Sequence, residues 1–295
     1  LTPLVLGYFK DRWVFGKEAK RLAVVGEDCT ETDLYGKAKR REKVSLAGKT
    51  YDAVWLLAKY ISLTLQDFEN IQYLTFTTPE TDVDMAKMLK GIGQHIGVDK
   101  EIINVQDYKE SFCQYMIFQP KELWQYESAL FYCDEDRIKA YMLRRLRVDA
   151  SHGMNSFVTV DEVANAQRKE LEALYPIMNK EKSPDESFKS MIENVFEKKV
   201  ISSVYLTGEG FEKNWYPNSL RVLCNGRRAF MGNNLYSKGA CYKSIRKCEP
   251  NDDGPIYLDE TKLTERICLR MRVDGQEGWY PLVTWGTHWY EADGQ

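Results

Sequence analysis

Histidine is scarce in this sequence, and the cysteines lack the spacing of a metal site. Only three histidines are present, none of them within a few residues of a cysteine. The seven cysteines form an odd number, follow no regular spacing and include no Cys-x-x-Cys pair. Structural zinc sites and disulfide frameworks both need such clusters or spacings. We therefore expect no metal site, and we expect reduced, mostly buried thiols in a cytoplasmic protein.

Long apolar runs and a strong net charge are also absent. The longest apolar stretches, such as AVWLLA at 53–58, are far shorter than the roughly 20 residues that span a bilayer. A net charge of −3 provides no general attraction to nucleic acid or to an anionic membrane. The chain opens with Leu1 and without the charged and apolar regions of a secretory signal. We expect a piece of a longer protein that binds neither nucleic acid nor membrane.

Common motifs for nucleotide binding and hydrolysis are missing as well. After Gly208 and Gly210, a dinucleotide-binding fingerprint would need a glycine where Lys213 stands. Gly48-Lys49-Thr50 looks like the end of a Walker phosphate loop, but Lys43 occupies the position of its first glycine. The sequence contains no Gly-x-Ser-x-Gly and no His-Glu-x-x-His motif. Rossmann enzymes, Walker ATPases, serine hydrolases and zinc proteases therefore have no local signature here.

What the sequence does contain is an alternation of strand and helix patterns, typical of an α/β protein. Strands are predicted at 3–8, 13–15, 73–79, 101–105, 201–208 and 227–232, with a hairpin over 127–145. Helices are predicted at 15–25, 51–67, 109–118, 219–225 and 233–245, and after a cap at Thr81 or Asp82 as far as about His95.

Four further segments carry explicit signals. Thr159-Val160-Asp161-Glu162 matches a capping box and predicts a helix over 159–182. Ser183-Pro184-Asp185-Glu186 adds a proline at the first helical position and predicts a second helix. The polar and basic segment 36–50 is predicted to be a loop or hairpin. From 255 onward, IYLDE, RICLRMRV and WYPLVTW alternate like antiparallel strands at the start of a separate β unit.

Three clusters of side chains each allow a functional and a structural interpretation. The basic run from Lys37 to Lys43 is either a phosphate-binding patch or a solvated loop. Trp279, Trp285 and Trp289 form either a sugar or peptide platform, or core and interface. The acidic run 134–136 either holds a cation or simply makes a turn. In each case we favour the structural interpretation.

Two glycine-containing segments remain as candidates for a ligand site. Gly208 and Gly210 end a predicted strand, where the lack of a Cβ atom lets a ligand approach the backbone. Further along, Lys238-Gly239-Ala240 places small residues on a predicted helix. Two such segments beside one crevice suit an adenosine pocket. A tight turn and close helix packing explain the same residues without any ligand.

The order of several segments carries a resemblance over residues 3–245. These segments are PLVL…RWVFGKEAK (3–20), YLTFTTPETDVDMAKMLKGIGQHIG (73–97), IINVQDYKESFCQYM (102–116), ALFYCDEDRIKAYML (129–143), SSVYLTGEGF (202–211) and LYSKGACYKS (235–244). Their order and spacing resemble the actin-like ATPase superfamily, the fold shared by actin, sugar kinases and the large heat-shock chaperone ATPases. More narrowly, the chain is similar to an uncharacterised bacterial family with a divergent actin-like domain.

The resemblance implies a two-lobed, actin-like (ribonuclease H-like) α/β fold with mixed sheets, truncated at its N-terminus and followed by the start of an antiparallel β unit. It implies an N-terminal lobe at 1–118 without its first hairpin, a C-terminal lobe at 119–247 and a β-rich domain at 248–295. It also implies ATP or ADP as the ligand of an adenosine-type motif. The residues that it implies nearest to this ligand are Gly208, Glu209, Gly210, Phe211, Lys238 and Gly239.

The sequence departs from the superfamily at the phosphate end of the implied site. The first phosphate loop of the family would lie upstream of Leu1. In the second loop, Tyr132 stands at the aspartate position and CDEDR replaces the glycines, so acidic groups would repel a triphosphate. The aspartates that anchor Mg²⁺ have no match, which argues against Mg²⁺ dependence. Where the family orients its attacking water, only Gln106 and Asp107 are available, and we assign no catalytic residue.

Three functions follow from these observations. We favour a degenerate actin-like or chaperone-like protein that acts as a conformational switch or scaffold and is at most a weak ATPase. The first alternative is a functional chaperone-like ATPase in the full-length protein. The second is a partner-binding module without nucleotide. In each case the expected partner is another protein or the rest of the same chain.

Overall fold

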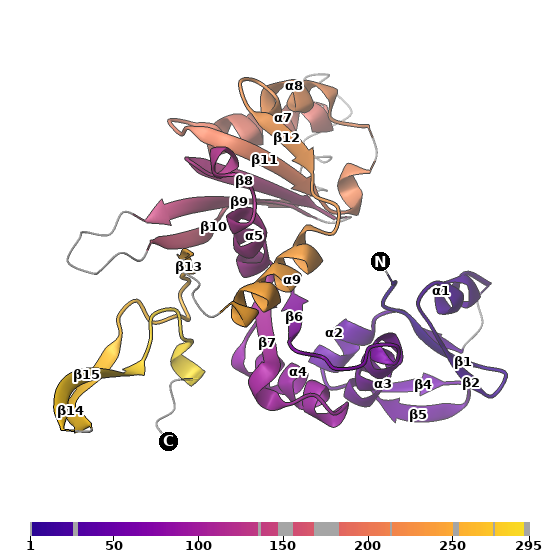
Figure 1. The fold of residues 1–295 in the computed structure, drawn as a ribbon. Coiled ribbons are helices and arrows are strands. Elements are labelled where there is room, and N and C mark those ends of the chain that lie inside the picture. Colours follow the sequence, from indigo (N-terminus) through magenta and orange to yellow (C-terminus); the bar gives the residue numbers. More distant parts are fainter. Residues whose placement is uncertain are drawn as a thin grey trace. The chain divides into compact units, whose positions relative to one another are not determined.

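The computed structural model describes residues 2–25, 29–134, 137–146, 156–167, 183–212, 214–249, 254–273 and 275–291. The chain divides into two compact units, residues 1–106 and 107–295 (Figure 1). It is a mixed α/β protein with several separate sheets, of which the largest is a mixed sheet of six strands. The predicted division after residues 118 and 247 stays a prediction.

Small sheets and four helices make up the described part of the first unit. The sheets consist of β1 (Leu6–Phe9), β2 (Arg12–Phe15) and β3 (Thr30–Glu31); of the hairpin β4 (Lys43–Leu46) and β5 (Lys49–Asp52); and of β6 (Leu74–Thr78) and β7 (Ile103–Asp107). The helices are α1 (Gly16–Val25), α2 (Leu34–Lys39), α3 (Ala53–Leu65) and α4 (Val83–His95). A core formed mainly by α3 and α4 joins these elements.

Helices α3 and α4 begin where the sequence places an aspartate. The Asp52 carboxylate accepts the backbone N–H of Val54 at 2.8 Å, and the Asp82 carboxylate accepts that of Met85 at 2.7 Å. Each bond satisfies an amide that has no partner within its helix. Of the two predicted caps for α4, Thr81 and Asp82, the structure therefore uses the aspartate.

The segment 36–50 differs in part from the predicted loop or hairpin. The hairpin β4–β5 forms, but residues 36–39 belong to helix α2, which Asp33 caps. The prediction missed this helix because it is short and rich in lysine. The ammonium group of Lys37 lies 2.7 Å from a carboxylate oxygen of Glu31. Part of the basic run is thus paired with acidic groups of the protein itself.

The second unit is built on a six-stranded sheet of order β12-β11-β8-β9-β10-β13. Its strands are β8 (Glu127–Cys133), β9 (Arg137–Leu146), β10 (Phe157–Gln167), β11 (Ile201–Thr207), β12 (Arg228–Met231) and β13 (Ile256–Tyr257). Strands β8, β9 and β10 form an antiparallel meander. On the other side, β11 runs parallel to β8, and β12 runs parallel to β11.

Helices cover both faces of this sheet (Figure 1). Helices α7 (Pro184–Phe196) and α8 (Pro217–Leu223) pack on one face, and α5 (Tyr108–Ile117) and α9 (Leu235–Cys248) pack on the other. The strands alternate between the two cores: on β8, Phe131 joins the α7 side and Leu130 joins the α5 side. No helix in the described part of the chain has the length and apolar character of a membrane span.

The structure corrects two predictions for the second unit. The helix predicted over 159–182 is wrong at its start, because residues 157–167 form β10; residues 168–182 lie outside the described residues. Val158 and Val160 are buried there, and pairing with β9 outweighs the capping-box pattern.

The second correction concerns the C-terminal strands. The first of them, β13, pairs parallel with β10 and so extends the six-stranded sheet, instead of opening an antiparallel unit. The other two, β14 (Ile267–Val273) and β15 (Gln276–Val283), form an antiparallel pair as predicted.

Candidate functional site

The six residues predicted to border a ligand form two groups in the second unit. The first group, residues 208–211, follows strand β11 and includes the short 3-10 turn Glu209–Phe211. The second group, Lys238 and Gly239, lies on helix α9. Each group packs against a different element of the protein, the first against β8 and the second against α5.

The two glycines after β11 lie against the end of strand β8. Gly208 has a backbone φ of 100°, which residues with a Cβ atom rarely adopt. A Cβ atom added at Gly208 would overlap the carbonyl oxygen of Cys133, and one added at Gly210 would overlap Cys133 Sγ. The indole N–H of Trp215 donates to the carbonyl oxygen of Gly210 at 2.8 Å. The space that these glycines leave is therefore filled by the protein itself.

The two side chains of this turn lie in different environments. Phe211 is only 2% exposed, and its ring centroid lies 5.5 Å from that of Phe188 and 5.3 Å from that of Tyr216. Glu209 is exposed to solvent. Phe211 is thus a core residue on the α7 side of the sheet, whereas Glu209 can meet an approaching ligand.

Gly239 lies where helix α9 packs on helix α5. A Cβ atom at this position would overlap the carbonyl oxygen of Ser111, so the glycine lets the two backbones touch. The neighbouring Lys238 is exposed. These contacts agree with the interpretation of close helix packing. That the six residues also border an adenosine group stays a prediction.

Acidic and aromatic groups surround the end of strand β8. Burial raises the pKa of the Tyr132 phenol, and the charges of Asp134 and Glu209 act in the same direction. The Tyr132 ring lies 6.5 Å from that of Tyr236, which stacks on Tyr108 with 3.8 Å between the centroids. Carboxylates and phenols offer a phosphate neither a positive charge nor a row of amide donors. This end of the sheet is therefore poorly suited to a triphosphate.

The acidic run 134–136 is visible only at its first residue, since Glu135 and Asp136 lie outside the described residues. The Asp134 carboxylate accepts the backbone N–H of Arg137 at 2.7 Å, which is a turn hydrogen bond. Within the part of the chain that the structure describes, no group of three or more His, Cys, Asp or Glu side chains could hold a metal ion.

A cluster of buried charges lies on the α5 side of the sheet. Glu110, in the first turn of α5, is 3% exposed. Its carboxylate lies 2.6 Å from Nζ of Lys243 on α9 and 2.8 Å from Nζ of Lys262, which follows β13. Burial alone would raise the pKa of Glu110, but the two ammonium groups outweigh it and hold the pKa well below its usual range. Three separate segments thus meet on one carboxylate.

Asp107 precedes this cluster as the N-cap of α5. Its carboxylate accepts the backbone N–H of Glu110 at 2.7 Å. Burial raises the pKa of Asp107 to about 6, and the charges of Glu110 and Asp259 act in the same direction. A carboxyl group with this pKa can take up or release a proton near neutral pH. Gln106, the other candidate in this stretch, is buried and has no such chemistry.

Sequence reasoning missed the Glu110 cluster. Lys243 is 133 residues away from Glu110 along the chain, so no local pattern connects them. One signal was available: Glu110 lies three residues before Cys113 and so falls on the apolar face of its helix. An acid on such a face needs a cationic partner, although the sequence does not say which one.

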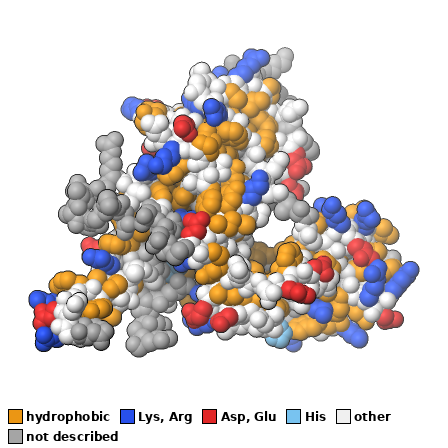
Figure 2. Space-filling model, in the orientation of Figure 1, with side chains coloured by type: hydrophobic (Ala, Val, Ile, Leu, Met, Phe, Trp, Pro, Cys, Tyr) orange, Lys and Arg blue, Asp and Glu red, His pale blue; other side chains and the backbone are white. Residues whose placement is uncertain are grey.

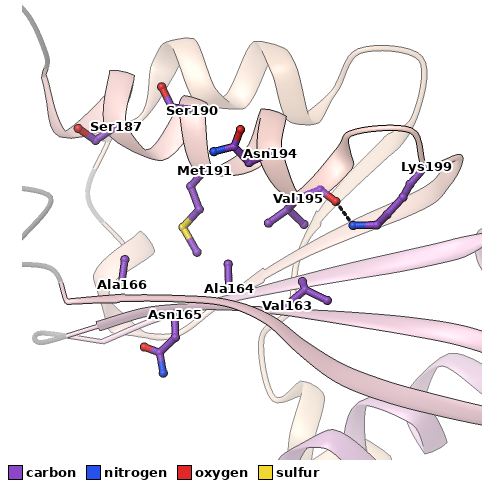
Figure 3. A pocket seen from close by; sticks show the side chains of 10 residues that line it. All are labelled: Val163, Ala164, Asn165, Ala166, Ser187, Ser190, Met191, Asn194, Val195 and Lys199. Carbon is purple, nitrogen blue, oxygen red and sulfur yellow. Dashed lines mark hydrogen bonds between the residues drawn. The ribbon is translucent and has the colours of Figure 1, made fainter.

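Grooves of ligand size open beside strand β10. One, of about 380 Å³, lies between β10 and α7, and there Met191 points toward Ala164 on the strand (Figure 3). Another, of about 590 Å³, runs along the edge of β10 at 159–162 beside residues 258–260. None of the six predicted ligand residues lines either of these two grooves.

Comparison with known families identifies the chain. Residues 1–260 match the family described as "Family of unknown function (DUF5716) C-terminal", and the chain belongs to this family. The match includes the six-stranded sheet, the helices on both its faces and Glu110, and it ends before Lys262 and the β14–β15 hairpin. No curated protein matches the chain.

Proposed function

We propose that this member of the DUF5716 C-terminal family is a degenerate actin-like domain that acts as a conformational switch or scaffold and hydrolyses ATP weakly or not at all. The sheet of the second unit supports the fold part of this proposal. A meander of three antiparallel strands, followed by two parallel strands on its other side, is the order of a ribonuclease H-like lobe. Helices on both faces of the sheet agree with it.

The observation that carries the proposal is the chemistry at the ends of β8 and β11. In the implied site, the phosphate groups would approach these strand ends. There the protein presents the Tyr132 phenol with Asp134 and Glu209, whose negative charges oppose those of a triphosphate. ATP or ADP remains the candidate ligand, but the adenosine part would have to supply most of its binding free energy.

The contact between α5 and α9 supports a role in conformational change. Helix α5 begins directly after Asp107, the residue at which the second unit starts. Its backbone at Ser111 touches α9 at Gly239 without intervening side chains. Backbone contact leaves little freedom for the two helices to move separately. We therefore expect a movement of the chain at the boundary between the units to be passed from α5 to α9.

Calorimetry with adenosine, ADP and Mg·ATP, together with a phosphate-release assay, tests this function. We expect adenosine and ATP to bind with similar affinity and ATP to remain intact. Glu209→Gln should then raise the affinity for ATP by about two- to fivefold, the effect of one exposed charge, and leave that for adenosine unchanged. Glu212→Gln, one residue beyond the same turn and also exposed, is the matched control and should change neither affinity.

Two results would favour the alternatives. Rapid, Mg²⁺-dependent phosphate release would support a functional chaperone-like ATPase. If none of the three ligands gives a heat of binding or raises the thermal stability, the result would support a partner-binding module without nucleotide.

The β14–β15 hairpin is the observation that favours a partner-binding module. Its apolar side chains are exposed, with Leu269 at 47%, Trp279 at 67% and Leu282 at 64%. Figure 2 shows hydrophobic side chains on the surface of this hairpin. A two-stranded hairpin alone is only marginally stable, and such a surface is typical of an interface. Sedimentation at rising concentration tests self-association through this surface. Leu269→Glu should prevent it, whereas Leu220→Glu on α8, where the leucine is similarly exposed at 43%, should not.

A further inference from the structure

The described residues from 254 to 291, that is 254–273 and 275–291, are here called the strap and are held together by their own hydrogen bonds. The backbone N–H of Leu263 donates to Thr287 at 2.9 Å, and that of Trp289 donates to Thr261 at 2.9 Å. The Thr261 hydroxyl lies 2.8 Å from Nδ1 of His288. The residues before β14 are thereby tied to those after β15, so the strap can move as one body.

Several contacts attach the strap to the rest of the second unit, among them a hydrogen bond from Arg246 to the carbonyl oxygen of Pro255 at 3.2 Å and a ring contact of Trp285 with Phe157 at 6.4 Å. Its strand β13 pairs with β10 over only two residues. The ring of Tyr257 is buried in the core on the α5 side. Lys262 reaches Glu110 at 2.8 Å with its side chain 4% exposed. The turn that presents Lys262 is shaped by Asp259, whose carboxylate accepts the backbone N–H of Thr261 at 2.8 Å.

The Lys262 contact is expected to stabilise the docked strap by only a modest net free energy. Taking an ammonium group out of water costs several kcal/mol, and only a well-compensated ion pair offsets this cost. Lys262 has to share its carboxylate, because Lys243 already neutralises Glu110 at 2.6 Å. The ring of Tyr257, 4.5 Å from Nζ of Lys262, adds a weaker attraction. The contact therefore slows the opening of the strap, but it is weak enough to break while the rest of the unit stays folded.

We propose that the strap is a releasable element. It docks on α5 and α9 through the ion pair between Lys262 and Glu110, and it detaches together with β13 as a unit while the other five strands of the sheet, β8 to β12, stay folded. On release, Glu110 keeps Lys243 as its partner, so no lone charge is left behind. The edge of β10 that β13 occupies would become free for a strand of another protein. The proposal needs no nucleotide and goes beyond the function proposed above.

Native-state hydrogen exchange of the whole chain tests the release. In the wild type, we expect the strap amides to exchange through a local opening. The free energy of this opening should fall less steeply with urea concentration than the free energy of the opening through which the amides of β8 and β11 exchange. Lys262→Met should speed the exchange of the strap at least tenfold and leave β8 and β11 unchanged. Lys243→Met is the matched control, since it removes the other ammonium group from the same carboxylate. Because Lys262 then has Glu110 to itself, exchange in the strap should stay constant or slow down.

Two outcomes would overturn the proposal. One is that the strap amides of the wild type exchange only with global unfolding, at the urea dependence of β8 and β11. The other is that Lys262→Met and Lys243→Met change the exchange of the strap alike. If Lys262→Met does not fold, the urea dependence of exchange in the wild type still shows whether the strap opens separately from β8 and β11.

Discussion

Two aspartates on opposite faces of the six-stranded sheet, the buried Asp185 and the half-buried Asp107, have pKa values that folding shifts in opposite directions. On the α7 side, Asp185 receives the backbone N–H groups of Asn218 at 2.7 Å and Ser219 at 2.8 Å, and also the Ser219 hydroxyl at 2.7 Å. Burial alone would raise the pKa of Asp185, but these hydrogen bonds outweigh it and lower the pKa. On the α5 side, burial prevails at Asp107 and raises its pKa to about 6.

This difference in pKa indicates that the two faces of the sheet have different roles. Asp185 belongs to α7 and caps helix α8, so its charge is satisfied by a fixed backbone. Asp107 shares its surroundings with Glu110 and Asp259, which repel it. Several hydrogen-bond donors outweigh burial and keep the carboxylate of Asp185 charged, whereas at Asp107 burial, with a smaller contribution from neighbouring carboxylates, favours the protonated form. The α7 side is therefore a structural core, and the α5 side holds the groups that can change charge or position.

Gly239→Leu should have the largest effect, because it disrupts the α5 side at the backbone itself. The new side chain would overlap the carbonyl oxygen of Ser111 and push α9 away from α5. We expect the second unit to lose its cooperative unfolding transition, measured by urea denaturation. Lys238→Leu, at the exposed neighbouring position, should unfold like the wild type. Equal behaviour of both variants would mean that the two helices do not touch as described.

Glu110→Gln should rank second, since it leaves two ammonium groups buried without a carboxylate. Breaking a buried ion pair from one side costs about 3–5 kcal/mol of the free energy of unfolding. Urea denaturation at neutral pH measures this loss. The exposed Glu193→Gln on α7 is the control and should cost less than about 0.5 kcal/mol. A loss at Glu110 as small as this would show that the cluster is open to water.

Asp107→Asn tests the contrast between the two aspartates through the pH dependence of stability. The pKa of Asp107 rises from 3.8 to about 6 on folding, so its protonated form stabilises the protein below about pH 4. This contribution, at most about 3 kcal/mol, is lost as the pH rises to about 6. Asparagine keeps the helix cap and removes the titration. The variant should thus be more stable than the wild type at pH 7 and should lack this part of the pH dependence in thermal unfolding.

Asp185→Asn should have the smallest of these effects, about 2 kcal/mol at pH 7, because the amide oxygen still accepts part of the hydrogen bonds. The pH dependence has the opposite sign. Since folding lowers the pKa of Asp185, its contribution is present above about pH 4 and is lost as the pH falls further. Thermal unfolding of the two variants between pH 3 and pH 7 compares both signs directly. The same sign for both aspartates would contradict the contrast between the two faces.

Much of the fold could be predicted wherever its signals are local. Ser183 caps α7 by accepting the backbone N–H of Glu186 at 3.2 Å, as the sequence predicts. The hairpin β8–β9 and the positions of strands β6 and β11 are also confirmed. Strand β10 was not predicted, because its first residues fit a helix cap as well as a strand. Only the pairing with β9 decides between helix and strand there.

The candidate site was predictable in one respect only. The sequence places Gly208 and Gly210 after a strand and Gly239 on a helix, and the structure agrees. It does not reveal that Cys133 and Ser111 fill the space beside them. Those neighbours come from other elements of the fold, so local sequence carries no trace of the contact.

By itself, the sequence determined where most helices and strands begin, because caps, turns and apolar periodicity act within a few residues. It also showed that Tyr132 and an acidic run beginning at Asp134, and no glycine-rich loop, stand at the end of the predicted strand. Only the tertiary structure decided that β13 runs parallel to β10 and that Lys243 and Lys262 meet on Glu110. Such pairings depend on contacts between segments that lie far apart in the sequence, and they form only once the sheet has brought those segments together.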